Sequence, residues 1–401
     1  MDGTYQEARL IETIDQSAMQ AQVEHWVAIN SGTRNLSGLA TMAGLLADAF
    51  SALPGEIAMI DPDPVETVES DGKVRAIDHG RHLLLRVRPN APVRMLFTGH
   101  MDTVYGADHS FQSARYLADG ALNGPGAADM KGGLAVMLAA LTAVEAAGIG
   151  ERFGYDVVIN SDEETGSFAS ARLIERMAAG KVAAFTYEPA LPDGTLAGAR
   201  GGTGNFSIVV SGRSAHAGRN PEDGRNAIVA AADIALRLNA EKGPRLAVNP
   251  ARIEGGGPNN VVPDHAVLRV NFRPHGQDEI ARARSRIDAI ATAVATSHDV
   301  GVAVHGSFNR PPKPIDAGAA KLFALVQAVG GDLSIPIGWR DTGGVCDGNN
   351  IAAQGVPVID TMGVRGGAIH SADEYMIVDS LAERAALSAV AISRIVAQGG
   401  L

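Results

Sequence analysis

Short apolar runs that alternate with long helical segments are the feature that most constrains the fold of this chain. Residues 82–87 and 94–98 are apolar runs bounded by turn residues, which predicts strands. Residues 155–160 form a continuous apolar run, typical of a strand buried in a parallel sheet. Helical spacing of apolar residues predicts helices at 13–30, 38–52 and 132–147. This alternation predicts an α/β sandwich.

The pattern changes near Gly201. The next hundred residues predict, in order, a strand at 205–211, a helix at 225–241, strands at 252–255 and 266–272, a helix at 278–297 and a strand at 301–305. This β-α-β-β-α-β order is a split βαβ unit that can fold by itself. We therefore expect residues 1–201 and 311–401 to form one domain and residues 202–310 an inserted one. The last helix is expected to begin in a capping box at Ser380–Glu383 and to end before Gly399.

Charge and composition narrow the classes of partner. The 401 residues carry 34 Lys and Arg against 45 Asp and Glu, a net charge of −11 without a basic run, which argues against a nucleic-acid surface. We find no apolar run near the roughly 20 residues that span a bilayer, and residues 1–7 lack the features of a signal peptide. One cysteine, Cys346, excludes an intrachain disulfide. These features predict a cytoplasmic protein that binds neither nucleic acid nor membrane.

Histidine and carboxylate side chains follow the predicted strands. His100 and Asp102 come at a strand end and share one face, so the carboxylate can orient the histidine toward a metal; a surface hydrogen-bonded pair is the alternative. Asp129 lies in the glycine-rich segment 124–133, which lacks a phosphate-loop signature because Gly132 follows Lys131. A helix N-cap is the other interpretation of Asp129.

Further acids follow two other strands. Asp162, Glu163 and Glu164 are consecutive after the run at 155–160, and a bound dication would offset their mutual repulsion. Glu188 ends another predicted strand, and His370 lies late in the chain. Together these segments supply the nitrogen and oxygen ligands that a pair of zinc or similar dications prefers.

The motifs resemble those of the co-catalytic dizinc peptidase family of glutamate carboxypeptidase, aminoacylase, acetylornithine deacetylase and succinyl-diaminopimelate desuccinylase, and most of all its glutamate carboxypeptidase branch. The resemblance covers nearly the whole chain, through motifs at residues 99–104, 124–133, 162–167, 187–189, 214–218, 260–263 and 370–375. It implies a zinc-peptidase-like α/β/α sandwich with an inserted ferredoxin-like lid, through which the protein forms a homodimer.

The resemblance also implies a site for two divalent ions, with Zn²⁺ expected and Co²⁺ or Mn²⁺ as alternatives. One metal would be held by His100 and Glu188 and the other by Glu164 and His370, with Asp129 bridging them. Asp102 would support His100, and the peptide after Asp129 would be cis. Glu163 would act as general base toward a water that bridges the metals.

The substrate-binding residues implied by the resemblance are more dispersed. His216 of the lid would reach across the dimer to the scissile carbonyl, and Asn260 would bind substrate; an ordinary lid histidine and a turn residue are the alternatives. Arg340 would hold a free α-carboxylate, unless it forms a salt bridge with Asp341. Arg365 and Arg310 are further candidates for substrate contact.

These assignments predict an amide hydrolase that releases a C-terminal, acidic, glutamate-like amino acid from an N-acyl or peptidyl conjugate. An N-acetyl or N-acyl amino-acid deacylase is the first alternative. A non-catalytic binding subunit on the same fold is the second.

Overall fold

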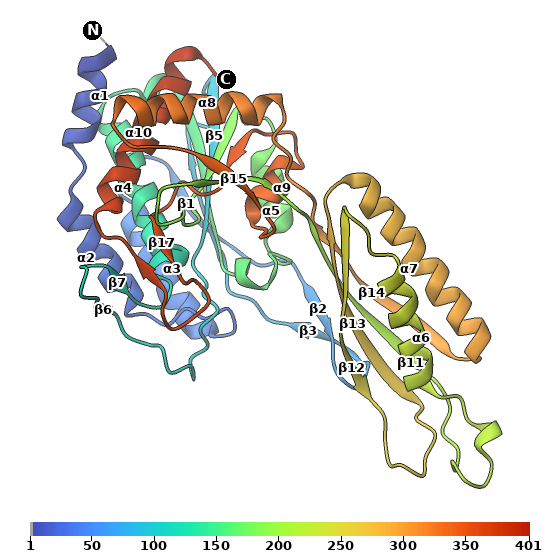
Figure 1. The fold of residues 1–401 in the computed structure, drawn as a ribbon. Coiled ribbons are helices and arrows are strands. Elements are labelled where there is room, and N and C mark those ends of the chain that lie inside the picture. Colours follow the sequence, from blue (N-terminus) through green and yellow to red (C-terminus); the bar gives the residue numbers. More distant parts are fainter. Residues whose placement is uncertain (1–2) are drawn as a thin grey trace.

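The larger domain is built on a mixed six-stranded sheet (Figure 1). The structure is a computed structural model and describes residues 3–401. The strands lie in the order β1 (Glu56–Ile60), β4 (His82–Val87), β8 (Phe153–Asn160), β5 (Val93–His100), β9 (Ala183–Thr186) and β16 (Val358–Ile359). Strands β8, β5, β9 and β16 are mutually parallel, whereas β1 and β4 are antiparallel to their neighbours. The predicted strand at 155–160 therefore has a parallel neighbour on one side only.

Alternating side chains of this sheet enter two separate cores. Phe97 and Tyr155 pack into the larger core, whereas Leu96 and Val158 point into the smaller one, as expected for a period of two. The larger core is covered by α1 (Gly3–Glu12), α2 (Gln16–Val27), α3 (Leu36–Phe50), α4 (Gly132–Ala146), α8 (Ala317–Asp332) and α10 (Ser380–Gln398). The smaller core is covered by α5 (Ala171–Ala178) and α9 (Asp347–Ala352). The predicted α/β/α sandwich is confirmed.

Helix α4 is apolar all round because it lies inside the protein. In the described part of the chain, Ala127–Ala146 is the one helical stretch long and apolar enough to cross a membrane, and 83% of its most apolar window is buried. Such burial is typical of the core helix of a folded domain.

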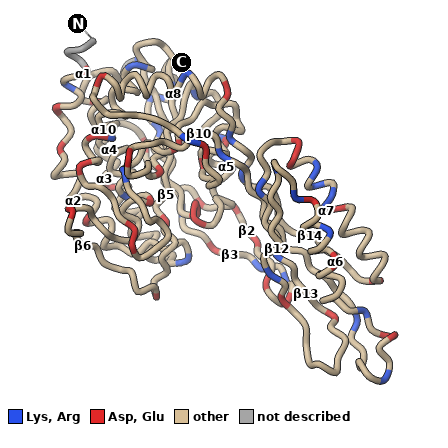
Figure 2. The backbone as a smooth tube through the Cα atoms, in the orientation of Figure 1, with Lys and Arg blue, Asp and Glu red and all other residues tan. Residues whose placement is uncertain are grey.

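The inserted domain, here called the lid, has the predicted β-α-β-β-α-β order. Its elements are β11 (Thr203–Ser211), α6 (Ala227–Ala240), β12 (Leu246–Gly255), β13 (His265–Pro274), α7 (Gln277–His298) and β14 (Gly301–Arg310). The antiparallel sheet has the ferredoxin-like order β12-β13-β11-β14, and its own core lies between one face and the two helices. The boundaries at 202 and 310 remain predictions. Basic and acidic residues are scattered over both domains (Figure 2).

A hairpin of the larger domain touches the lid, a contact that the sequence did not predict. It consists of β2 (Val65–Val68) and β3 (Val74–Ile77), and it reaches the sheet face of the lid (Figure 1). Val68 packs against two valines of that face, and its carbonyl oxygen accepts a hydrogen bond from Arg269 Nη2 at 2.6 Å. This contact attaches the lid to the larger domain in addition to the two chain connections.

Two smaller sheets complete the fold. A parallel pair joins β10 (Leu196–Arg200) to β15 (Trp339–Thr342), and β6 (Arg115–Tyr116), β7 (Leu122–Asn123), β18 (Tyr375–Met376) and β17 (Gly366–Gly367) form the other sheet.

Helix α10 ends before Gly399 as predicted, but the expectation that Ser380 caps it is wrong. Ser380 Oγ instead donates to the Ile377 carbonyl at 2.6 Å, and Glu383 pairs with Arg365.

Candidate metal centre

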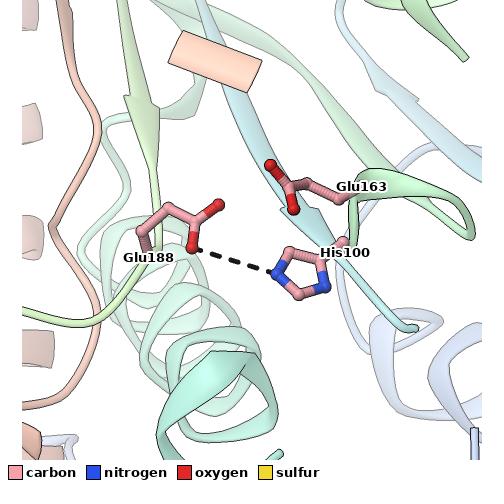
Figure 3. A group of neighbouring side chains, drawn as sticks. All are labelled: His100, Glu163 and Glu188. Carbon is pink, nitrogen blue, oxygen red and sulfur yellow. Dashed lines mark ion pairs between the residues drawn. The ribbon is translucent and has the colours of Figure 1, made fainter. Parts of the chain in front are cut away.

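The candidate ligands gather at the carboxyl edge of the large sheet. His100 ends β5, Glu163 begins the short turn Glu163–Thr165 after β8, and Glu188 follows β9. Because β8, β5 and β9 are parallel neighbours, their ends meet at one place. Figure 3 shows the Glu188 carboxylate facing a ring nitrogen of His100, with Glu163 directed toward the same space.

Asp129 enters this site from the turn that precedes α4. The peptide between Asp129 and Met130 is cis, as the resemblance implied. The Glu374 carboxylate accepts hydrogen bonds from the backbone N–H groups of Ala128 and Asp129, both at 3.0 Å, and so fixes the turn. A Cβ at residue 133 would lie 2.0 Å from the Tyr187 carbonyl oxygen, so glycine there lets α4 approach the segment that carries Glu188.

The two oxygens of Asp129 face two different histidines. Oδ1 lies 3.1 Å from His100 Nε2, and Oδ2 lies 3.3 Å from His370 Nε2. His370 Nε2 is also 3.1 Å from Glu164 Oε2, and His100 Nε2 is 3.9 Å from Glu188 Oε2. Asp129 therefore lies between a His100–Glu188 pair and a His370–Glu164 pair, and it does not cap α4.

The chemistry of this donor set fits divalent cations. His100 Nδ1 lies 2.9 Å from the Asp102 carbonyl oxygen, which can only accept a hydrogen bond, so Nδ1 carries the proton. In the neutral ring, the lone pair of Nε2 then points toward Asp129 and Glu188, an arrangement that is stable only with a cation or proton between them. Burial also raises the pKa of Glu163 to about 7 and that of Glu164 to about 8. Nitrogen and carboxylate ligands of this kind suit zinc and similar ions.

His100 belongs to two close groups of possible metal-ligand atoms. His100, Glu163 and Glu188 place one ligand atom each within 4.8 Å of one another, and so do His100, Asp129 and Glu164. These two groups contain four of the five ligands expected from the sequence, together with Glu163. His370 belongs to neither group and approaches the site through Asp129 and Glu164.

Asp102 supports more of the site than the sequence predicted. Its Oδ1 lies 3.4 Å from His100 Nδ1. The same carboxylate accepts hydrogen bonds from the backbone N–H groups of Glu163 at 3.1 Å and Glu164 at 3.2 Å, and from the Thr33 hydroxyl at 2.7 Å. One buried carboxylate thus fixes both the histidine and the turn that carries the two glutamates.

We expect Asp102→Asn to weaken metal binding about 10- to 100-fold, as is typical when a group that supports a ligand is changed. The amide keeps one acceptor oxygen but cannot accept from both N–H groups and the hydroxyl. Competition with a chromophoric chelator measures the change. Unchanged affinity with a folded variant would contradict this role.

Arg310 is the main site residue whose place the sequence did not reveal. It ends β14 of the lid and is buried, with Nη2 lying 2.7 Å from Glu163 Oε1 and 3.4 Å from Asp347 Oδ1. Nη2 also donates to Ser167 Oγ at 2.8 Å and to the Glu163 carbonyl at 3.1 Å. Arg310 and Glu163 are 147 residues apart, so no local pattern links them.

A cavity of about 300 Å³ opens beside the candidate ligands. Its lining includes Arg340, which extends from β15, and Arg200, at the end of β10. Arg365 is not part of the lining: it pairs with Glu383 at 3.2 Å and donates to the Pro192 carbonyl at 3.3 Å.

His216 and Asn260 lie elsewhere, in neighbouring loops of the lid. The loops meet where Ala217 N donates to the Asn260 carbonyl at 2.9 Å. The segment between β11 and α6 that contains His216 lies at the end of the lid far from the large sheet (Figure 1). Within one chain, the structure does not bring either residue to the cavity.

Comparison with known protein families decides the class of this site. The model of the family described as "Peptidase family M20/M25/M40" matches residues 96–394, a range that contains all five candidate ligands. The chain belongs to this family. It is therefore a metal-dependent hydrolase of peptide or amide bonds, as the donor set at the sheet edge indicated.

Relatives and solved structures agree with the M20 assignment. Carboxypeptidase G2 from Pseudomonas sp. (strain RS-16) is 28% identical over 386 residues, covering 94% of this chain and 89% of the relative. A succinyl-diaminopimelate desuccinylase from Gluconacetobacter diazotrophicus is 29% identical over 321 residues, covering 75% and 80%. The crystal structure of a tripeptidase from Staphylococcus aureus superposes with a TM-score of 0.75 at 23% identity, covering 96% of this M20 chain and 100% of the tripeptidase. At that identity the superposition supports the fold alone.

Proposed function

We propose that this M20 peptidase hydrolyses the amide bond of an N-acyl or peptidyl amino acid and releases the C-terminal amino acid. The observation that carries the proposal is the position of Asp129 between two histidine–glutamate pairs, next to a cavity that contains Arg340. The relative named Carboxypeptidase G2, which matches along 94% of the chain, supports release from the carboxyl end.

In this proposal two dications, taken to be Zn²⁺, are held by His100 and Glu188 on one side, by His370 and Glu164 on the other, and by Asp129 between them. When bound, such a pair supplies Lewis-acid activation of water and of the scissile carbonyl. Co²⁺ or Mn²⁺ would suit the same donors.

Glu163 is the proposed general base. It removes a proton from the attacking water and passes it to the leaving nitrogen. Its carboxylate faces the candidate ligands without belonging to either histidine–glutamate pair, and Arg310 holds one of its oxygens at 2.7 Å. That ion pair favours the charged form, which is the form that accepts a proton.

A homodimer is part of the proposal because the structure does not bring His216 to the site of its own chain. The lid loop with His216 lies far from the cavity of its own chain, which supports the proposal that a second subunit brings this histidine, and Asn260 beside it, to a substrate. Val229 and Leu236 on α6 of the lid are exposed apolar side chains that suit such a contact. We also propose a cytoplasmic location, with which the free thiol of Cys346 is compatible.

Release of free amino acid from a panel of conjugates tests the proposed activity. Metal-loaded protein is incubated with peptidyl, N-acetyl and N-succinyl amino acids, with and without a chelator. Chelator-sensitive release is expected, and the preferred class separates a carboxypeptidase from a deacylase. No release from any conjugate by protein with two bound metals would contradict the proposal.

Replacing Arg340 by alanine is expected to raise KM more than it lowers kcat. A hydrogen bond to a charged group contributes about 1.5–3 kcal/mol, so kcat/KM for substrates with a free carboxylate should fall about 10- to 100-fold. Amide analogues of the same substrates should be hydrolysed equally by both proteins. An equal loss for acid and amide would exclude carboxylate binding by Arg340.

A further inference from the structure

Both chain connections of the lid are held by the first turn of α9. Asn349 Nδ2 donates to the Gly201 carbonyl at 2.9 Å and to the Pro311 carbonyl at 2.7 Å, so one amide group binds the segment that enters the lid and the segment that leaves it. Asn350 Nδ2 donates to the Asn309 carbonyl at 3.1 Å. Both asparagine side chains are buried. The start of α9 therefore fixes the place where the lid joins the larger domain.

Arg310 links the segment that leaves the lid to the candidate base. Its buried side chain places Nη2 2.7 Å from Glu163 Oε1, and Nη2 donates to the Glu163 carbonyl at 3.1 Å and to Ser167 Oγ at 2.8 Å. Nε has no hydrogen-bond partner among the described residues, so the contact with Glu163 depends on Nη2 alone. A contact through one nitrogen is sensitive to a small shift of the backbone at residue 310.

Asp347, the first residue of α9, completes this network. Its Oδ1 lies 3.4 Å from Arg310 Nη2 and accepts a hydrogen bond from Ser167 Oγ, and its Oδ2 accepts one from Asn160 Nδ2 at 2.8 Å. Asn160 ends β8, three residues before Glu163. The same short segment, residues 347–350, thus contacts both the lid connections and the turn that carries the base.

Arg310 is the one cation that pairs with the Glu163 carboxylate. Among the ion pairs of the described residues, Glu163 takes part only in the pair with Arg310. A general base must lie within hydrogen-bond reach of the proton that it removes. A misplacement of about 1 Å can lower the rate about a hundredfold. The direction of this carboxylate therefore depends on where residue 310, and with it the lid, is held.

We propose that Arg310 is a positioning residue through which the seating of the lid sets the orientation of the Glu163 carboxylate. The inference rests on the proposed function, because it takes Glu163 to be the general base. A merely structural arginine would compensate the buried charges of Glu163 and Asp347 and stabilise the fold. Its effect on kcat would then not depend on whether residue 163 can act as a base.

A double-mutant cycle between Arg310 and Glu163 separates these two roles. Arg310→Gln is expected to lower kcat about 10- to 100-fold, with KM and bound metal changed less than about twofold, because the base is present but misdirected. In protein that already carries Glu163→Gln, the same substitution should lower kcat less than about threefold, since no base remains to be positioned. Steady-state kinetics and elemental analysis of the four metal-loaded proteins measure the cycle.

Two further variants control for folding and for charge. Arg310→Lys keeps a cation between the buried carboxylates but lacks the planar fork, so kcat should still fall about tenfold at a melting temperature near that of the wild type. This variant carries the test if Arg310→Gln does not fold. Arg286→Gln removes an arginine of α7 that pairs with Glu241 at 2.7 Å on the lid surface, and it should change neither kcat nor KM.

Asn349→Ala tests the dependence on the lid. It removes both hydrogen bonds to the lid connections and leaves Arg310 and Glu163 in place. We expect kcat to fall about 3- to 10-fold in the wild-type background and less than about twofold in Arg310→Gln, where the link to the base is already lost. An equal loss in both backgrounds would overturn the coupling between lid and base.

The outcomes distinguish this inference from the proposed function. An unchanged kcat in Arg310→Gln, or an equal loss with and without Glu163→Gln, would overturn the inference while the hydrolase proposal stands. Absence of release from every conjugate would overturn the proposed function. Crystal structures of the metal-loaded wild type and Arg310→Lys would then still test the inference, and an unchanged position of the Glu163 carboxylate would overturn it.

Discussion

Glu163→Gln is expected to lower kcat about 10²- to 10⁴-fold while both metal ions stay bound. The amide has the shape of the carboxylate but cannot take a proton from water. The Asp102 hydrogen bond to the Glu163 backbone N–H does not depend on the side chain, so the turn should be preserved. Steady-state kinetics and metal analysis of the purified variant measure the two quantities.

The adjacent residue provides the control. Glu164→Gln alters a carboxylate 3.1 Å from His370 Nε2 and should lower both metal content and activity. Loss of activity with intact metal content at Glu163, and loss of both at Glu164, would separate the two roles. Substantial turnover by Glu163→Gln would exclude it as the base.

Asp129→Asn is expected to reduce the bound metal from two ions to one or fewer and to lower kcat/KM about 10³-fold or more. Each oxygen of Asp129 faces a different histidine, at 3.1 and 3.3 Å. An asparagine offers one oxygen and one amide group with no acceptor, so it cannot serve both sides and does not offset the charge of two dications.

Elemental analysis and activity across a range of zinc concentrations measure this effect. The matched control is Asp373→Asn, which removes the same charge from an exposed position in the loop after His370 and should change neither quantity. Two bound metals with wild-type activity in Asp129→Asn would rule out a bridging carboxylate.

The fold, and the position of the candidate ligands at strand ends, could be predicted largely from local patterns, whereas the role of each ligand came from the resemblance to a family. Strands such as β5 and β8 have clear apolar periodicity, and the residue after a parallel strand lies at a shared edge, so His100, Glu163 and Glu188 follow from their position in the sequence. The lid could be predicted for the same reason, because each of its elements is long enough to show its period.

The features that sequence reasoning missed depend on contacts between distant segments. Arg310 reaches Glu163 only because β14 continues to residue 310 rather than ending near 305, as predicted. The capping box predicted at Ser380 is not formed, because Ser380 Oγ donates to the Ile377 carbonyl and Glu383 pairs with Arg365, a partner that no spacing rule indicates. Short strands such as β10 and β15 pair although they are 142–143 residues apart in the sequence, and they have too few residues for a period to appear.

The hairpin of β2 and β3 also limits how the lid can move. A domain joined only at its two chain connections could swing about any axis through that end of its sheet. The contact of Val68 with Arg269 and with the valines of the lid face adds a third point of attachment away from the connections. A swing of the lid about its two chain connections must therefore carry the hairpin along, bend it, or break the contacts of Val68. The hairpin of β2 and β3 thereby restricts the directions in which the lid can move relative to the larger domain.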